Sequence, residues 1–159
     1  MDQVVNKLDY DTNEWVVSNV ASACAIYGQD QAPWAYTPNF PELKTYDFEI
    51  EEMDGSTRSV SVNEIDCALQ AGDGKKNPTD AGLRMDNTKY MLTYFDDETG
   101  VAQLARRGGG GAAICKTATG VIIALFEKEG VDSNGKSQNI ADVSAQVSAM
   151  ATYLKEQGF

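Results

Sequence analysis

The sequence predicts an α+β domain built on a central antiparallel β-sheet. Short runs rich in β-branched and aromatic residues follow one another between tight turns, and apolar residues recur at helical spacing near both ends of the chain. Strands joined by short turns pair antiparallel, and 159 residues suffice for one domain with its own core. We therefore expect a single domain over residues 1–159, with helices at both ends of the sheet.

The first third of the chain predicts a helical start and two hairpins. The expected elements are a short helix near 4–8, an ordered stretch at 15–20, a strand at 21–28, a turn at 29–32 and a strand at 34–36. Pro38 and Pro41 then end the sheet locally, because proline cannot donate to a strand ladder. Apolar and acidic residues alternate over 46–51, and alternation resumes over 58–62 after a turn at 53–56. This second hairpin, at about 45–63, is expected to form an acidic arm.

The rest of the chain predicts one short helix, a meander and a terminal helix. A helix begins at Asn63 or Glu64 and ends near Gly72, before a polar loop at 73–80. The expected strands are 89–95, 101–105, 112–116 and 121–126, with turns at 96–100 and 118–120. The spacing of Ile140, Val143, Val147, Met150, Ala151 and Leu154 predicts an amphipathic C-terminal helix.

Four consecutive glycines at 108–111 precede the strand at 112–116. We expect them to form a ribbon without side chains, over which a helix packs unusually close. Such a run could also cradle phosphates, but no Gly-Lys-Ser/Thr follows at the spacing of a phosphate-binding loop, since Lys116-Thr117 lies beyond the strand. A structural role is the better interpretation.

The charge of the chain argues against several classes of function. The formal net charge is −11, and residues 1–64 carry 12 acidic and 3 basic residues. Binding to a nucleic-acid backbone needs clustered lysine and arginine, so a nucleic-acid partner is not expected. No apolar run is long enough to span a bilayer, and the first residues lack the pattern of a secretory signal. We expect a cytoplasmic protein whose three scattered cysteines are reduced and buried.

Catalytic and metal-binding patterns are missing from the sequence. There is no histidine, so the commonest general base and metal ligand are both absent. The acidic pairs Glu51-Glu52 and Asp96-Asp97 lack the spacing of a calcium loop and are interpreted as solvated turn charges. We expect no enzyme activity, no cofactor and no metal.

Two groups of residues could serve binding. Trp34, Tyr153 and Phe159 combine large flat rings with polar tips, which suits a polyproline II segment, although Trp34 and Tyr153 could equally be core residues. The basic residues Lys89, Arg106 and Arg107 lie in or beside neighbouring strands of an acidic chain. They could dock an acidic protein surface or could be ordinary solubility charges.

The order of these motifs resembles the profilin family. The similarity runs from Lys89-Tyr90-Met91 through Arg106-Arg107 and the glycine run to Lys116-Thr117, and on to Tyr153-Leu154 and Gly158-Phe159; a weaker match covers 22–34. The acidic hairpin looks like the extra arm of alveolate (apicomplexan-type) profilins. The resemblance implies N- and C-terminal helices together on one face of the sheet and shorter helices on the other.

The resemblance also implies binding of monomeric actin and of proline-rich partners such as formins, in the cytoplasm and at the cytoskeleton. It places Trp34, Tyr153 and Phe159 in the polyproline groove. The implied actin face comprises Lys89, Arg106, Arg107, Lys128, Glu129, Val131 and Ser144. Ser144 stands where the family usually has asparagine, and the overall acidity argues against phosphoinositide binding.

The N-terminal part of the groove departs from the family pattern. Profilins usually carry a tryptophan and a tyrosine in the N-terminal helix, where this chain has Gln3 and Asn6. Trp15 or Tyr10 could substitute, and Trp15 is the candidate included in the site. The alternative function is a scaffold of the same fold that binds another peptide or a lipid headgroup; an enzyme is the least favoured interpretation.

Overall fold

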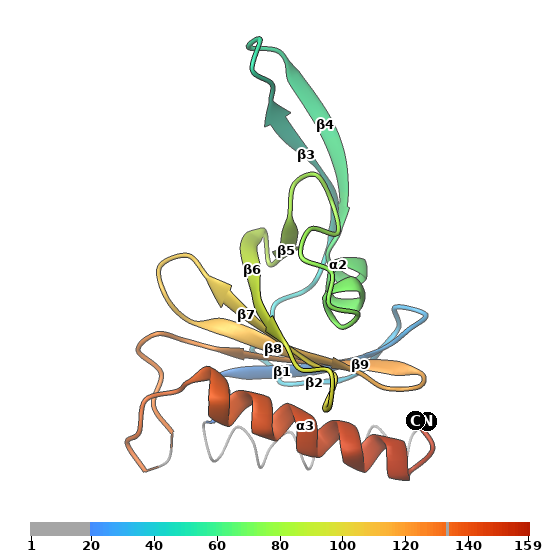
Figure 1. The fold of residues 1–159 in the computed structure, drawn as a ribbon, viewed down its shortest axis with the longest axis vertical. Coiled ribbons are helices and arrows are strands. Elements are labelled where there is room, and N and C mark those ends of the chain that lie inside the picture. Colours follow the sequence, from blue (N-terminus) through green and yellow to red (C-terminus); the bar gives the residue numbers. More distant parts are fainter. Residues whose placement is uncertain (1–19, 133) are drawn as a thin grey trace.

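The computed structural model describes residues 20–132 and 134–159. Seven strands form one antiparallel sheet in the order β2-β1-β9-β8-β7-β6-β5, and β3 and β4 pair as a separate two-stranded sheet. In chain order the elements are β1 (Ala23–Gly28), β2 (Pro33–Tyr36), β3 (Thr45–Glu51), β4 (Thr57–Asn63), α2 (Glu64–Ala71), β5 (Leu83–Met85), β6 (Thr88–Phe95), β7 (Val101–Arg106), β8 (Gly111–Lys116), β9 (Gly120–Phe126) and α3 (Ile140–Glu156). Figure 1 shows α3 below the large sheet, α2 above it and β3–β4 projecting away.

The meander predicted over 89–126 is confirmed. Strands β6, β7, β8 and β9 pair successively, and β9 also pairs with β1, which brings the first hairpin into the same sheet. Strand β9 is buried along almost its whole length because it lies in the middle of the sheet and is covered on both faces. Its uninterrupted apolar sequence is typical of such a strand.

Strand β5 was not predicted. It pairs with β6 through a two-residue turn at Asp86 and Asn87, whose φ angles are 52° and 51°. Two successive left-handed residues are typical of a tight hairpin turn, and aspartate and asparagine tolerate that conformation better than most residues. The Asp-Asn pair was the sequence signal for this hairpin.

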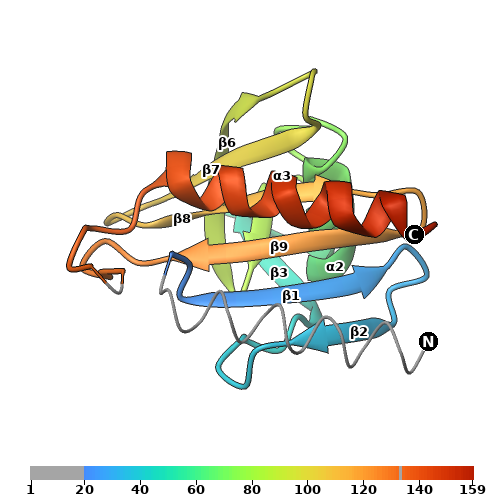
Figure 2. The same cartoon turned by 90° about the horizontal axis from the view of Figure 1, so that it is seen from below.

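Helix α3 covers one face of the sheet, as Figure 2 shows from below. Its predicted apolar stripe is confirmed, because Val143, Val147, Met150, Ala151 and Leu154 are all buried. They pack in one cluster with the small residues of β8 and β9, which include Ala113, Cys115 and Ala124. The short side chains there let the helix axis lie close to the strands. The helix predicted near 4–8 lies outside the described residues.

The second face of the sheet carries α2, the helix predicted between 63 and 72. Asn63 caps it by accepting a hydrogen bond from the Asp66 N–H at 3.1 Å, and Gly72 follows its last residue. Cys67, Ala68 and Ala71 are buried in a cluster that also contains Leu83 and Ile114. The sheet is therefore sandwiched between α2 and α3.

The hairpin of β3 and β4 projects from the α2 side, and its root is fixed by a buried carboxylate. Glu64 is 1% exposed and accepts hydrogen bonds from the Lys44 N–H at 3.0 Å, the Asn87 N–H at 2.7 Å and the Tyr46 hydroxyl at 2.9 Å. Three segments thus meet at one side chain, and the paired donors offset the cost of burying it.

The glycine run does not form the expected ribbon under a helix. Gly108, Gly109 and Gly110 have φ angles of 91°, 107° and 78° and make the turn between β7 and β8. Only Gly111 enters a strand. The prediction was wrong because consecutive glycines serve equally well where a turn needs left-handed backbone, and local sequence does not separate the two uses. Close packing against α3 comes instead from alanine and cysteine.

Candidate functional site

Trp34 lies flat over two glycines that face each other across strands. Gly28 of β1 and Gly120 of β9 are paired in register. A Cβ added at Gly28 would lie 2.8 Å from Trp34 Nε1, and one at Gly120 would lie 2.9 Å from Trp34 Cζ3. Both distances are shorter than van der Waals contact, so only glycine leaves room for the indole. This pair provides the close approach that the sequence had suggested for residues 108–111.

Phe159 packs its ring against Trp34 in a T-shaped arrangement. The two ring centroids are 5.8 Å apart, and the planes meet at 71°. The Phe159 carbonyl accepts hydrogen bonds from the Thr119 N–H at 3.0 Å and the Thr119 hydroxyl at 3.1 Å, which tie the end of the chain to the turn before β9. Tyr153 of α3 is half-buried and belongs to the same hydrophobic cluster. The structure therefore brings together Trp34, Tyr153 and Phe159, the three predicted proline-site aromatics that lie within its described part.

Within this aromatic cluster Trp34 is 8% exposed, and Tyr153 and Phe159 are partly buried at its border. Tilted aromatic rings with polar tips suit a ligand that is already extended, since the ligand's carbonyls can accept from indole or phenol donors while its apolar rings stack. Trp15, the remaining aromatic candidate, lies outside the described residues.

Arg106 ends β7 in a partly buried polar cluster. Its guanidinium forms an ion pair with Glu127 at 2.5 Å and lies 3.4 Å from the Tyr90 hydroxyl. Burial works against the charged form, but the hydrogen bonds and charges of Glu127 and Tyr90 outweigh it and raise the pKa of Arg106. Tyr90 faces the α2 side of the sheet. Arg106 therefore helps to shape this end of the sheet and is not a freely solvated charge.

Other charged residues of the predicted actin face gather at the same end. Arg107 lies exposed in the turn after β7, and the stem of Lys128 covers Gly109, where an added Cβ would lie 2.6 Å from Lys128 Cδ. Glu129 is exposed in the segment after β9, and Val131 nearby is 52% exposed. Arg107, Lys128 and Glu129 form a mixed-charge rim around the glycine turn.

Lys89 and Ser144 lie away from Arg106, on the α3 side of the sheet. Lys89 precedes Tyr90 on β6, so the two side chains leave opposite faces. Met91, two residues further on, is 64% exposed beside it, and sequence reasoning did not include it in the site. Because side chains alternate between the two faces of a strand, Met91 lies on the same face as the charged Lys89, and this pattern could have identified it as exposed.

Ser144 has a buried hydroxyl without a hydrogen-bond partner among the described residues. It lines a small hollow of about 210 Å³ together with Thr99 and Gln103. The predicted actin residues therefore divide into a rim at the end of the sheet and a strip along β6, β7 and α3.

Within residues 20–132 and 134–159, no three histidine, cysteine, aspartate or glutamate side chains are placed to hold a metal ion. Cys24, Cys67 and Cys115 are free and buried, and burial raises the pKa of each thiol. None of the helices described here is both long and apolar enough to cross a membrane.

Comparison with known proteins gives consistent results. The model of the family described as Profilin matches residues 9–159. A profilin of Tetrahymena pyriformis is 31% identical over 110 residues, which cover 68% of this chain and 71% of the relative. The fold is similar to that of rat profilin 2a, with a TM-score of 0.63 and 13% identity over 98% of this chain and 99% of that one. It is similar to that of Acanthamoeba castellanii profilin IA, with a TM-score of 0.58 and 18% identity over 92% of this chain and 98% of that one. It is also similar to that of mouse profilin IIa, solved in complex with a double repeat from the FH1 domain of mDia1. The TM-score is 0.56 and the identity 15%, over 92% of this chain and 98% of that one.

Proposed function

This chain belongs to the profilin family, and we propose that it binds monomeric actin and proline-rich segments and so regulates actin polymerisation. The activity lies in its surfaces, and the protein performs no chemistry of its own. Actin binding follows from family membership, and its site is the surface formed by Lys89, Arg106, Arg107, Lys128, Glu129, Val131 and Ser144. The charged rim around the glycine turn offers basic groups on an otherwise acidic molecule, which supports charge-steered docking.

Proline-rich binding is supported by one observation above all: Trp34 packs on the Gly28–Gly120 pair, and the Phe159 ring contacts it in a T-shaped arrangement. A polyproline II segment loses little conformational entropy on binding and suits such a rigid aromatic platform. Mouse profilin IIa was solved in complex with a double repeat from the FH1 domain of mDia1. We propose that Trp34, Tyr153 and Phe159 receive the proline-rich segments of formins here, with Trp15 as a further contributor.

The relative from Tetrahymena, an alveolate, supports placing this chain with the alveolate-type profilins. We propose that the hairpin β3–β4, with Asp47, Glu49 and Glu51 on one face, is the acidic arm that the resemblance implies. We place the protein in the cytoplasm and at the cytoskeleton. A net charge of −11 opposes binding to anionic phosphoinositide headgroups and to nucleic acid.

The charge reversal Arg107→Glu tests the actin surface. Arg107 is exposed, so the fold is retained while a basic group at the rim becomes acidic. We expect actin affinity to fall about tenfold, mainly through slower association, in a fluorescence titration with monomeric actin. The matched control Lys75→Glu changes an exposed lysine in the loop after α2 and is expected to bind like the wild type.

Equal affinity of Arg107→Glu and the wild type would remove Arg107 from the actin surface. If the wild type itself does not bind actin, the alternative function, a scaffold for another peptide or a lipid headgroup, takes precedence. A pull-down with monomeric actin separates these two functions directly.

A further inference from the structure

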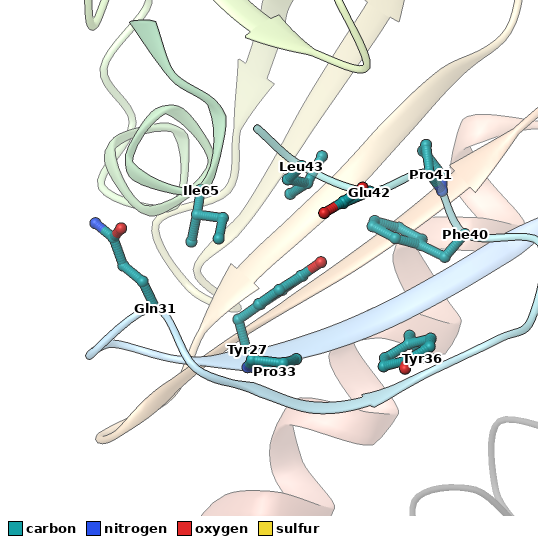
Figure 3. A pocket seen from close by; sticks show the side chains of 9 residues that line it. All are labelled: Tyr27, Gln31, Pro33, Tyr36, Phe40, Pro41, Glu42, Leu43 and Ile65. Carbon is teal, nitrogen blue, oxygen red and sulfur yellow. The ribbon is translucent and has the colours of Figure 1, made fainter. Parts of the chain in front are cut away.

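A second aromatic pocket lies on the α2 side of the sheet, on the opposite face from Trp34. It encloses about 470 Å³ between β1, β2, the segment after β2 and α2, and Figure 3 shows its lining. Rings of Tyr27, Tyr36 and Phe40 and the side chains of Leu43 and Ile65 make its apolar walls. This volume is within the usual range of ligand-binding pockets. None of the residues in the proposed actin or proline-rich site lines it.

Tyr27 turns a polar group into this pocket. The residue is 8% exposed, and its hydroxyl opens into the pocket without a hydrogen bond to another described residue. The hydroxyl lies toward Glu42, as Figure 3 shows. Burial, and then the nearby Tyr36 and Glu42, raise the pKa of Tyr27, so the phenol stays protonated at neutral pH and can donate or accept a hydrogen bond. A ligand in the pocket can therefore form a hydrogen bond with this hydroxyl.

A second hollow, of about 490 Å³, adjoins the pocket and shares Glu42 with it. It follows the root of the arm, and Asp47, Glu49 and Asp86 line it together with a single cationic group, Lys44. The two hollows thus form one groove that is aromatic at one end and acidic at the other. We call it the Tyr27–Asp86 groove.

We propose that the Tyr27–Asp86 groove binds an extended basic segment of a partner protein, with one arginine side chain in the aromatic pocket and further basic residues along the acidic end. An arginine combines a long apolar stem with a flat cation that stacks on aromatic rings. Its guanidinium can donate to the Tyr27 hydroxyl and to the Glu42 carboxylate together. The next basic residues of an extended segment then meet Asp47, Glu49 and Asp86.

The chemistry of the groove discriminates against other ligands. An anionic ligand would be repelled by Glu42, Asp47, Glu49 and Asp86, which outnumber Lys44. A purely apolar side chain would cover Glu42 and leave the Tyr27 hydroxyl without a partner, which costs free energy. A basic group with an apolar stem packs against the aromatic walls and also pairs with Glu42 and the Tyr27 hydroxyl.

The test measures fluorescence anisotropy of a labelled octapeptide of alternating arginine and serine against the full-length protein. Tyr27→Phe removes only the hydroxyl, and Glu42→Gln removes only the charge; we expect each to weaken binding about tenfold, the loss typical of a hydrogen bond to a charged group. The control Asp97→Asn removes an exposed acid from the turn between β6 and β7 and is expected to bind within twofold of the wild type. A peptide with citrulline in place of arginine is expected to bind at least tenfold more weakly.

Three outcomes would overturn the proposal. Equal losses of affinity for Glu42→Gln and Asp97→Asn would indicate attraction by net charge alone. Wild-type affinity of Tyr27→Phe, or equal affinity of the wild type for the citrulline and arginine peptides, would also contradict it. Circular dichroism checks that each variant is folded. Peptide-induced NMR shifts at the methyl groups of Leu43 and Ile65 provide a readout that needs no variant. Oligoproline is expected not to compete with the arginine peptide, because it binds at the Trp34 site on the opposite face. Loss of peptide binding to the groove can therefore be distinguished from loss of proline-rich binding.

Discussion

At the scale of single residues, glycine determines where an aromatic ring can lie. Trp34 occupies the space that side chains at Gly28 and Gly120 would fill, and the Phe159 ring packs against the indole in a T-shaped arrangement. Neither glycine has a left-handed φ angle. Their role is therefore steric and not conformational, in contrast to that of Gly108 and Gly109 in the turn.

Gly120→Ala tests this arrangement. The added methyl would lie 2.9 Å from Trp34 Cζ3 and 3.0 Å from the Tyr27 carbonyl oxygen, so the indole must shift. We expect a loss of about 2 kcal/mol in the free energy of unfolding, as for other overpacked sites. Affinity for oligoproline, followed by tryptophan fluorescence, is expected to fall at least fivefold. Ala118→Ser, an exposed change in the same turn, serves as control, and unchanged oligoproline binding by Gly120→Ala would show that Trp34 is only a core residue.

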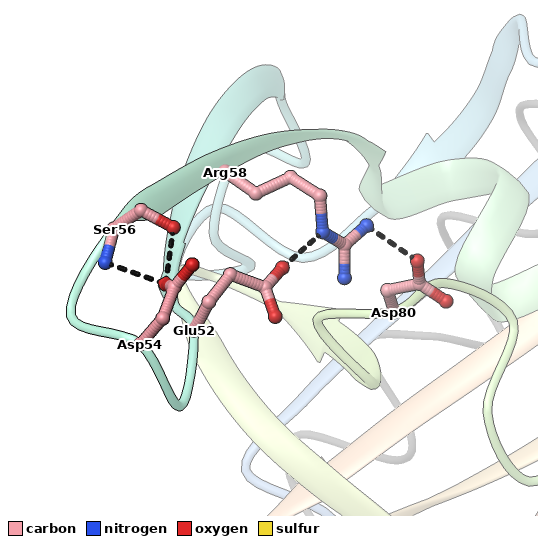
Figure 4. A network of polar contacts seen from close by, with 5 residues as sticks. All are labelled: Glu52, Asp54, Ser56, Arg58 and Asp80. Atoms are coloured by element: carbon pink, nitrogen blue, oxygen red, sulfur yellow. Dashed lines mark hydrogen bonds and ion pairs between the residues drawn. The ribbon is translucent and has the colours of Figure 1, made fainter.

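At the scale of elements, exposed ion pairs link the arm to a neighbouring loop, and the hydrogen bonds of buried Glu64 fix its root. Arg58 of β4 bridges Glu52 at 2.6 Å and Asp80 at 2.8 Å, which links the arm to the loop after α2 (Figure 4). These groups are well exposed, and exposed pairs contribute little to stability. The buried hydrogen bonds of Glu64 are the stronger attachment.

The start of α3 offers a prediction about capping. The Asn139 side chain accepts from the Asp142 N–H at 2.9 Å and donates to the Asp142 carboxylate at 2.8 Å. Asn139→Ala removes both bonds, and we expect a loss of about 1 kcal/mol in the free energy of unfolding by urea denaturation. Ser148→Ala, in the middle of the helix, is the control. A change below 0.3 kcal/mol or so would mean that the cap is dispensable.

The same cap gives a pH dependence. Hydrogen bonds from Asn139 and Lys136 lower the pKa of Asp142 from its ordinary value of 3.8. A carboxyl group whose pKa is lowered on folding stabilises the native state above its unfolded pKa, and this contribution is lost as the pH falls through the lowered value. The difference in stability between the wild type and Asp142→Asn is therefore expected to shrink below about pH 4.

At the scale of the whole molecule, the three cysteines report on opening of both sides of the sheet. Cys24 and Cys115 lie in the cluster under α3, and Cys67 lies in the cluster under α2. All three are at most 3% exposed, and burial raises the pKa of each thiol. Thiolate is the reactive form, so both effects protect them.

We expect the native protein to react with a thiol reagent such as DTNB at no more than a small fraction of the rate of the unfolded chain. Because the two clusters share one sheet, all three thiols are expected to become reactive at the same urea concentration as the loss of circular dichroism. A thiol that reacts rapidly in native buffer, or that becomes reactive well before the global transition, would contradict a single cooperative unit.

Local sequence patterns were sufficient for the order of elements. Period-2 alternation located the arm, and strand-like runs between short turns located the meander. The spacing from Ile140 to Leu154 located α3 within two residues of its observed end. They were insufficient where one residue type serves two purposes. Consecutive glycines suit a turn as well as a ribbon, and the three-residue strand β5 is too short to produce a period.

The candidate site shows the same division. The sequence indicated Trp34, Tyr153 and Phe159 as a group, and the structure places them together, but it also separates Lys89 from Arg106 by the thickness of the sheet. The pairing of Arg106 with Glu127 and the groove at Tyr27 join segments that are far apart in the chain. No local pattern encodes such contacts.

The amino-acid sequence by itself determined the strands, the terminal helix and the acidic character of this protein, because these depend on periodicity and composition. Only the tertiary structure decided which glycines lie beneath an aromatic ring, which cation is paired and where a pocket opens. Those properties depend on register and on the crossing of distant segments, which packing of the complete chain fixes.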